Sequence, residues 1–401
     1  MRVAIKAILV IVITIAASII LAAIIIDRSK FEGREKAAEA VQPKVPVVED
    51  GGSWPMFRGG QRLLGRASGV LPDSLDLVWK FKTEGEIKSS PVISDGLVFV
   101  GSADANTYAI DLAKGHKVWE YPTGGTVEAA PCVVEGVVFV GSSDTFLYAI
   151  DAKSGASKWR YKTDGKILGA ANWTRSPDGQ RTWVLVGSYD SKLHCVDAAT
   201  GKSVWTYETD SYVNGSPAVG GGKVVFGGCD AMLHVVWLAD GSKVREIDSG
   251  SFIAASAAVL EGHVYVGNYD SVFIKADIAT GEIVWRYAGG DSPYFSSPAV
   301  GKEVVVFGGR DNRVHCVRRS DRNVAWTFKT LGEVDSSPVI CGDKVVVGSE
   351  DGRLYMIRPS DGEAVWSYEI GQPVSSSPAV ASGRIVVGCD DGYVYAFGPK
   401  R

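Results

Sequence analysis

The chain has 401 residues, of which 46% are hydrophobic, and a formal net charge of −4 at pH 7. This apolar fraction is typical of a globular protein and excludes a chain that is disordered throughout. The 42 Lys and Arg residues against 46 Asp and Glu residues argue against a nucleic acid partner, because nucleic-acid-binding domains are usually strongly basic. Six cysteines are too few for a disulfide scaffold. The 47 glycines and 11 tryptophans indicate tight turns and a recurring aromatic anchor, which favour an all-β fold.

The first predicted element is an apolar segment at residues 7–26. It contains no charged residue, and Arg2 and Lys6 precede it. A helix of this length rises about 30 Å, which matches the hydrocarbon core of a bilayer. We therefore predict an uncleaved transmembrane signal anchor that places the following chain outside the cytoplasm, although Arg28 and Lys30 weaken that orientation. A cleaved signal peptide is the alternative, and it also exports the rest of the chain.

The next segment, residues 27–53, mixes charged residues with alanine and then contains Pro43, Pro46 and two adjacent glycines. Such a composition buries no core, so we predict a flexible tether. The expected organisation is therefore an anchor at residues 1–26, the tether at 27–53 and one folded domain at 54–401.

The folded domain is built from repeats of about 40 residues. One tryptophan in each unit marks this period, at Trp79, Trp119, Trp159, Trp205, Trp285, Trp326 and Trp366. In one unit, Arg245 occupies the position of the tryptophan. Each unit contains four short apolar runs separated by Gly, Asp or Asn turns, which is the pattern of a four-stranded β-propeller blade.

A column of aspartates sets the register of the units, at Asp104, Asp144, Asp190, Asp230, Asp270, Asp311, Asp351 and Asp391. We interpret these carboxylates as turn-forming rather than metal-binding. The eighth unit, Ser375–Phe397, has only three strands, whereas an extra strand at Leu77–Phe81 precedes the first unit. If that strand completes the last blade, the ring closes without loose edges. The sequence thus predicts an all-β, eight-bladed β-propeller of four-stranded blades behind an N-terminal transmembrane helix.

Two repeats carry a family resemblance. Tyr108–Asp111 followed by Gly115 and Trp119, and Cys195–Gly201 followed by Trp205, resemble the tryptophan-docking repeat of pyrroloquinoline-quinone-like (PQQ-like) propellers. The segment Trp54–Gly59 is similar to the lead-in of the non-enzymatic, exported members of that family. The resemblance implies eight blades in which each docking tryptophan wedges between neighbours, and it implies much less about function.

The quinone-dependent enzymes of that family use a pair of adjacent cysteines, a Ca²⁺ site and a catalytic aspartate. No Cys-Cys pair occurs in this sequence, and its units are nearly uniform in length. We therefore expect no enzyme, with neither catalytic residues, a cofactor nor a metal site. His194, His234 and His315 alternate with tyrosines in one repeat column, so we interpret them as packing residues. Cysteines that share a repeat column, Cys195 with Cys316 and Cys229 with Cys389, fall in non-adjacent blades, too far apart for a disulfide. Cys132 and Cys341 have no partner column, so we predict six free thiols.

The loop that enters each inner strand varies most among the units, and variable positions on a rigid ring suit a binding surface. From these loops we select as candidate partner-binding residues Glu86, Lys88, Glu128, Tyr212, Phe252, Tyr294, Phe295 and Asp335. The alternative is a structural role, in which the aromatic members cover the channel mouth and pack on neighbouring loops. The expected function is a membrane-anchored, extracytoplasmic scaffold for a protein or peptide partner, with a role in envelope assembly. The alternative is a propeller that binds carbohydrate or another small ligand, or a degenerate quinoprotein-like enzyme.

Overall fold

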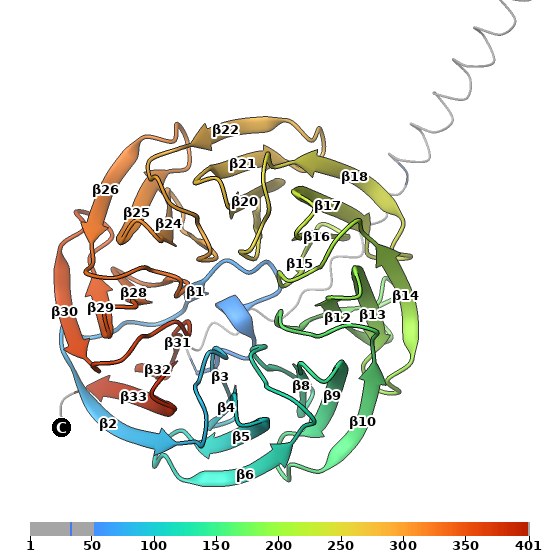
Figure 1. The fold of residues 1–401 in the computed structure, drawn as a ribbon, viewed down its shortest axis with the longest axis horizontal. Helices are drawn as coiled ribbons and strands as arrows, with labels where there is room; N and C mark the ends of the chain where they lie inside the picture. Colours follow the sequence, from blue (N-terminus) through green and yellow to red (C-terminus); the bar gives the residue numbers. More distant parts are fainter. Residues whose placement is uncertain (1–32, 34–51, 400–401) are drawn as a thin grey trace, which may run out of the picture. The chain divides into compact units, whose positions relative to one another are not determined.

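The computed structural model describes Gly33 and residues 52–399. Residues 52–399 form eight sheets arranged in a closed ring, and their strands pair antiparallel except where β1 joins one sheet in parallel (Figure 1). The predicted all-β, eight-bladed propeller of four-stranded blades is therefore confirmed. The predicted anchor at residues 1–26 lies outside the described residues, as does nearly all of the tether. Among the residues that are described, no helix is both long and apolar enough to cross a membrane.

Blades 1 to 4 follow one another along the chain, each running from the inner to the outer strand. Blade 1 contains β3 (Val92–Ser94), β4 (Leu97–Gly101), β5 (Asn106–Asp111) and β6 (Lys117–Pro122). Blade 2 contains β7 (Cys132–Val134), β8 (Val137–Gly141), β9 (Phe146–Asp151) and β10 (Ser157–Lys162). Blade 3 contains β11 (Asn172–Arg175), β12 (Thr182–Ser188), β13 (Lys192–Asp197) and β14 (Ser203–Glu208). Blade 4 contains β15 (Ala218–Gly220), β16 (Lys223–Gly227), β17 (Met232–Trp237) and β18 (Lys243–Asp248).

The remaining blades include strands from the start of the domain. Blade 5 contains β19 (Ala258–Leu260), β20 (His263–Gly267), β21 (Phe273–Asp277) and β22 (Ile283–Tyr287). Blade 6 contains β23 (Ala299–Val300), β24 (Val304–Gly309), β25 (Arg313–Arg318) and β26 (Val324–Lys329). Blade 7 contains β27 (Val339–Cys341), β28 (Lys344–Gly348), β29 (Arg353–Ile357) and β30 (Ala364–Glu369), and the short β1 (Arg66–Ala67) joins it in parallel. Blade 8 contains β31 (Ala379–Ala381), β32 (Arg384–Gly388), β33 (Tyr393–Pro399) and β2 (Leu75–Lys82).

The ring closes through blade 8, which takes strands from both ends of the domain (Figure 1). Strand β2 pairs antiparallel with β33, in a register that places Leu77 opposite Phe397 and Trp79 opposite Ala396. The predicted closing strand is thus confirmed, with slightly wider bounds than the sequence indicated. Because β2 covers the outer edge of this sheet, blade 8 has the same four-stranded form as the other blades.

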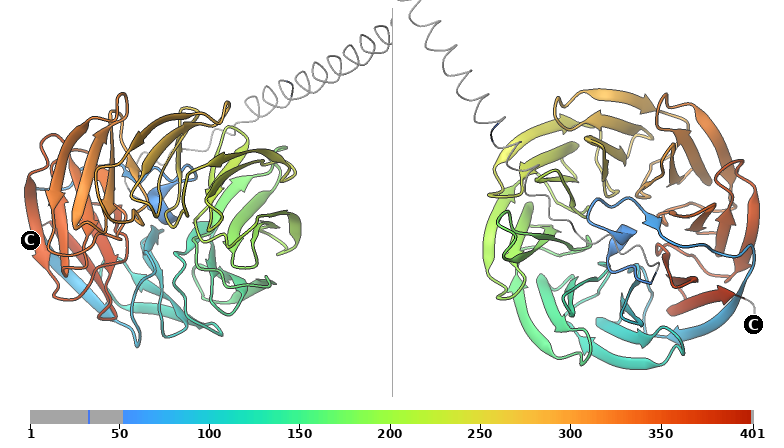
Figure 2. Two further views of the ribbon diagram at one scale, coloured as in Figure 1. Left: turned by 45° about the horizontal axis from the view of Figure 1, so that its top comes forward. Right: turned by 180° about the vertical axis from the view of Figure 1, so that it is seen from behind.

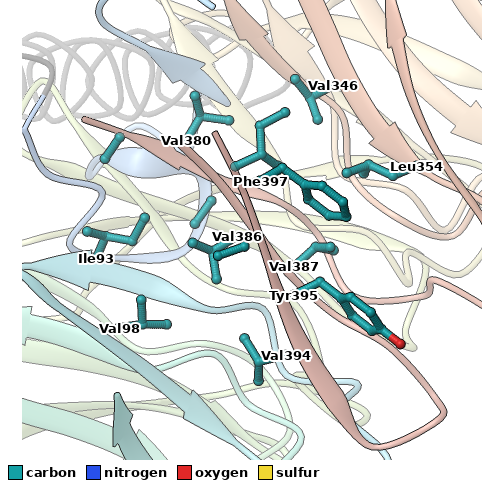
Figure 3. Packing of buried hydrophobic residues seen from close by; sticks show 14 of the residues in the cluster. Ile93, Val98, Val346, Leu354, Val380, Val386, Val387, Val394, Tyr395 and Phe397 are labelled. Atoms are coloured by element: carbon teal, nitrogen blue, oxygen red, sulfur yellow. The ribbon is translucent and has the colours of Figure 1, made fainter. Parts of the chain in front are cut away.

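The core lies between the blades. In blade 8, Val386, Val387 and Phe397 are buried, in the same cluster as Leu354 of blade 7 and Val98 of blade 1 (Figure 3). The inner three strands of the blades are mostly apolar on both faces because each sheet packs against a neighbour on either side. Burial of a valine or phenylalanine contributes about 1.5–3 kcal/mol, so a closed ring of such contacts stabilises the whole fold.

The docking tryptophans connect successive blades. The indole Nε1–H of Trp119 donates to the carbonyl of Ala152 at 2.9 Å, and its ring lies against Gly155 of blade 2. Any larger residue there would collide, since a Cβ on Gly155 would lie 2.8 Å from the indole. The same donation to the following blade is made by Trp79, Trp159, Trp205, Trp285, Trp326 and Trp366. At the position without tryptophan, the guanidinium of Arg245 donates to the carbonyls of Ala279 and Thr280.

The aspartate column holds the turns between second and third strands. In blade 1, Asp104 Oδ1 accepts from the Asn106 amide at 3.0 Å, and the Tyr108 hydroxyl donates to Asp104 Oδ2 at 2.8 Å. Where histidine replaces tyrosine, as at His194, its ring joins Asp190 to a tyrosine of the preceding blade. All six cysteines are free, as predicted; Cys229 is partly exposed and the others are buried.

Candidate functional site

The centre of the ring is occupied by the chain itself (Figure 1). Residues 52–70, which we call the channel plug, contain β1 and the 3₁₀ turn η1 (Phe57–Gly59) and lie at the centre of the ring (Figures 1 and 2). The Gly52 carbonyl accepts from the Ser382 hydroxyl, which belongs to the turn between β31 and β32. The plug therefore lies beside the turns that join first and second strands, and we call this end of the ring the plug face.

The plug is hydrogen-bonded to every blade. Six of its carbonyls accept from the backbone amides of one repeat column, in the pairs Trp54–Ile93, Pro55–Val133, Gln61–Val219, Arg62–Val259, Leu64–Val300 and Gly65–Ile340. The side chain of Gln61 reaches the Trp173 carbonyl of blade 3, and Gly52 contacts blade 8. These amides line the inner edges of the innermost strands, where they would otherwise lack a backbone partner. The plug thus provides hydrogen-bond acceptors for backbone amides at the inner edges of the blades.

A buried arginine locks the plug in place. The Arg58 side chain is only 2% exposed, and its guanidinium donates to the carbonyls of Ser337 and Pro338 in the loop entering blade 7. Burial lowers the pKa of Arg58 to about 9. A buried guanidinium is costly unless it is hydrogen-bonded, so this side chain acts as a specific anchor rather than a surface charge.

The candidate residues from the sequence gather at the opposite end, which we call the loop face. There, the loop that enters each inner strand meets the turn between the second and third strands of the same blade. One backbone hydrogen bond repeats in all eight blades, from amide to carbonyl, in the pairs Ala103–Glu86, Ser143–Thr126, Tyr189–Lys166, Cys229–Tyr212, Tyr269–Phe252, Arg310–Pro293, Glu350–Glu333 and Asp390–Pro373. The turn residues in these pairs form a surface column that the sequence analysis missed. The signal was present, because each directly precedes the constant aspartate.

Aromatic side chains cover the loop face over blades 3 to 6. Tyr212, Phe252 and Tyr269 are 49%, 54% and 50% exposed. The Tyr189 and Tyr212 rings stack with centroids 4.7 Å apart, and the Tyr269 and Phe295 rings lie 5.4 Å apart. These five side chains, which we call the aromatic arc, come from neighbouring blades and present ring surface to solvent.

Tyr294 is not part of this surface, and its selection as a partner-binding residue was wrong. Its side chain is fully buried, with its ring 5.0 Å from Phe307 and 5.4 Å from His315. The reason is its repeat position, because Tyr294 occupies the buried column held elsewhere by residues such as Ile87 and Val374. Burial raises the pKa of the Tyr294 hydroxyl.

Charged side chains continue the loop face from blade 6 onward. The Arg310 guanidinium lies over the Phe295 ring, 3.9 Å from its centroid, and donates to Asp335 at 2.6 and 3.0 Å. It also forms an ion pair with Glu333 at 3.2 Å. In blade 1, Lys88 pairs with Glu86 at 3.2 Å, and both side chains are about half exposed. Glu128 is exposed in blade 2.

Between these pairs lie two carboxylates with perturbed titration. The pKa of Glu350 is raised, first by burial and then by the charges of Asp335 and Asp390. The pKa of Asp390 is also raised by burial, although the Ser375 hydroxyl and Lys88 oppose the shift. Both shifts arise first from burial, and nearby carboxylates add to them.

The structure supplies no obvious ligand set for the Ca²⁺ of a quinone enzyme. Across residues 52–399, no three or more His, Cys, Asp or Glu side chains are grouped so that they could hold a metal ion. The turn aspartates are instead engaged by backbone amides and by neighbouring tyrosines or histidines.

Comparisons with known proteins place this geometry in a family. Residues 173–400 match the family model described as "Beta-alanine-activating enzyme, beta-propeller", and residues 65–178 match that of "Outer membrane protein assembly factor BamB". No curated protein sequence matches the chain.

Solved structures share the fold at low sequence identity. BamB from Moraxella catarrhalis is 17% identical with a TM-score of 0.69, over 81% of this chain and 100% of that one. A quinohemoprotein alcohol dehydrogenase from Pseudomonas putida is 14% identical with a TM-score of 0.74, over 88% and 81%. The quinohemoprotein alcohol dehydrogenase from Comamonas testosteroni is 14% identical with a TM-score of 0.72, over 91% of this chain and 84% of that one. Since the first family model covers more than half of the chain, this protein belongs to the β-propeller family described as "Beta-alanine-activating enzyme, beta-propeller", and its blades carry the PQQ-like repeat of a BamB-like fold.

Proposed function

We propose that this propeller is a protein-binding scaffold that recognises its partner with the loop face. The observation that carries the proposal is the aromatic arc, in which Tyr212, Phe252 and Tyr269 are about half exposed on neighbouring blades. Exposed aromatic side chains that cluster on a rigid frame are typical of protein interfaces, where they supply most of the binding energy. The plug lies on the ring axis and its Gly52 contacts the opposite face, so a partner that binds at the ring axis meets the loop face.

The match of residues 65–178 to the model of an outer membrane protein assembly factor supports a role in envelope assembly. The apolar segment at residues 7–26 supports a location in the inner membrane with the propeller outside the cytoplasm. On this proposal, the anchor holds the ring near the membrane and the loop face captures a partner there.

The aromatic arc is tested by substitutions that remove ring surface and leave the blades intact. In the full-length protein, Phe252→Ser and Tyr269→Ser should each reduce in-cell cross-linking to the partner by roughly tenfold, because a truncated hot-spot residue commonly costs 1–2 kcal/mol or more of binding. The matched control is Val324→Ser on the outer strand β26, where the valine is 53% exposed. Cross-linked species are identified by mass spectrometry, and melting temperatures show that all three variants fold.

If the control loses the cross-link as strongly as the arc variants, or if none of them changes it, the loop face is not the binding surface. If the cross-links formed by the parent protein contain only its own chain, the scaffold proposal is replaced by self-association.

The orientation is tested separately with reporter fusions. A reporter active only in the periplasm, fused after Arg401, should be active, and one active only in the cytosol should be silent. The full-length chain should stay in the membrane pellet after carbonate extraction, because an apolar helix of this length inserts stably. An active cytosolic reporter would reverse the orientation, and a soluble product beginning near Asp27 would show that the anchor is cleaved.

A further inference from the structure

The loop face is chemically divided. Its aromatic arc spans blades 3 to 6, and carboxylates occupy the equivalent repeat positions from blade 7 to blade 1. We call these the acidic arc, and its members are Glu333, Asp335, Glu350, Asp390 and Glu86. Phe295 and Asp335 share one repeat position, and all other members of both arcs belong to the two hydrogen-bonded columns. Because these columns run through consecutive blades, both arcs surround the ring axis on the loop face. A ligand that spans this end therefore meets ring surface on one side and carboxylates on the other.

The acidic arc holds more negative charge than its own cations neutralise. Arg310 pairs with Asp335 and Glu333, and Lys88 pairs with Glu86. Among residues 52–399, neither Glu350 nor Asp390 forms an ion pair with a Lys or Arg. Burial raises the pKa of both carboxyl groups; Asp335 and Asp390 add to the shift at Glu350, whereas the Ser375 hydroxyl and Lys88 oppose it at Asp390. A cation from outside would relieve this repulsion and would gain from the partly buried surroundings.

The boundary between the arcs shows which cation the surface suits. The planar guanidinium of Arg310 lies on the Phe295 ring while it donates two hydrogen bonds to the Asp335 carboxylate. This combines a cation–π contact with a bidentate ion pair, and an arginine makes both at once because its guanidinium is flat. Elsewhere on the loop face, the exposed rings of Tyr212, Phe252 and Tyr269 and the carboxylates of Glu350 and Asp390, which form no ion pair with Lys or Arg, offer these two kinds of contact separately.

We propose that the loop face binds an extended segment of a partner protein in which arginine or lysine residues accompany aromatic side chains. This inference rests on the proposed scaffold function and adds the chemistry of the partner. The basic residues of the segment lie against the acidic arc, and its aromatic residues pack on Tyr212, Phe252 and Tyr269. The plug lies on the ring axis and is hydrogen-bonded to every blade, so the segment lies across the loop face and does not pass through the ring. A neutral oligosaccharide would stack on the rings but would leave the crowded carboxylates uncompensated.

The inference is tested by fluorescence anisotropy with the detergent-solubilised full-length protein. The probes are labelled eight-residue peptides that alternate arginine with tryptophan, glutamate with tryptophan, or arginine with glycine. We expect the first peptide to bind at least about tenfold more tightly than either of the others, because each of those lacks one of the two recognised groups. Raising the salt concentration should weaken its binding, since partly exposed charges are screened.

The decisive variant is the double change Glu350→Gln and Asp390→Asn, which removes two charges and almost no volume. It should weaken binding of the arginine–tryptophan peptide by about tenfold or more. The matched control, Asp76→Asn with Glu363→Gln, removes the same charge from exposed positions in β2 and in the turn before β30, and it should change binding less than about twofold. Equal losses in the two double variants would reveal non-specific attraction to net charge and would overturn the inference.

The remaining outcomes separate this inference from the scaffold proposal. The inference that the partner segment is basic would be overturned if the glutamate–tryptophan peptide bound as tightly as the arginine–tryptophan peptide. It would also be overturned if a neutral hexasaccharide bound more tightly than the arginine–tryptophan peptide. If that happens while Phe252→Ser still weakens the cellular cross-link, the scaffold function stands with a partner of different chemistry. If the cross-link is also insensitive to Phe252→Ser, both proposals fail.

Discussion

A chain that begins at Leu71 should fold into a complete but less stable ring, whereas a chain that begins at Glu84 should lose cooperative unfolding. The first truncation removes only the plug, and the second also removes β2, the outer strand of blade 8. The plug buries Trp54, Met56 and Leu63 almost completely. At about 2 kcal/mol for each buried side chain, its removal should lower the melting temperature by on the order of 10 °C.

The loss of β2 is of a different kind. Without it, β33 presents an unpaired edge, and the join between blades 7 and 8 loses the contact that the Trp366 indole makes with the Leu75 carbonyl. A ring that cannot close exposes the facing sides of two blades, so blades near the gap should unfold independently of the rest. Thermal unfolding followed by circular dichroism and calorimetry distinguishes the cases, with a chain beginning at Gly52 as the reference. If the chain that begins at Glu84 melts like the reference, closure by β2 does not hold the ring together.

Replacing Trp119 by alanine should lower the free energy of unfolding by about 3–5 kcal/mol, the usual range for a buried aromatic residue. The side chain is 8% exposed, it packs against Phe99, and its Nε1–H hydrogen bond to Ala152 spans two blades. Arg245→Ala is the matched control, because Arg245 occupies the same repeat position in blade 4. Its guanidinium is partly exposed and mainly donates to two carbonyls, so its loss should cost less than about 2 kcal/mol.

Urea unfolding of the two variants measures this difference directly. The midpoint should fall clearly further for Trp119→Ala than for Arg245→Ala, and Trp285→Ala should resemble the former because its ring is equally buried. Equal, small shifts in all three variants would mean that the tryptophan column does not dock the blades.

Much of the architecture followed from repetition along the chain. The tryptophan and aspartate columns set the blade length and register, and the unpaired strand at Leu77–Phe81 predicted the closure that the pairing of β2 with β33 confirms. These features are readable because each strand pairs mainly with its neighbours in sequence, so local pattern and tertiary contact agree. The error at Tyr294 arose from judging an aromatic residue by its loop alone, although its column is otherwise filled by buried aliphatic side chains.

The sequence by itself determined an all-β ring of eight four-stranded blades and located the variable loops at one end of the inner strands. Only the tertiary structure decided what fills the channel and which loop residues share a surface. The plug does not share the repeat pattern, and its partners lie far away in the chain, as with Arg58 and Ser337. No local sequence pattern therefore predicts that this segment occupies the centre of the ring. The side-by-side placement of Phe295, Arg310 and Asp335 likewise depends on blades meeting around an axis, because contacts between repeats are set by the closure of the ring and not by distance along the chain.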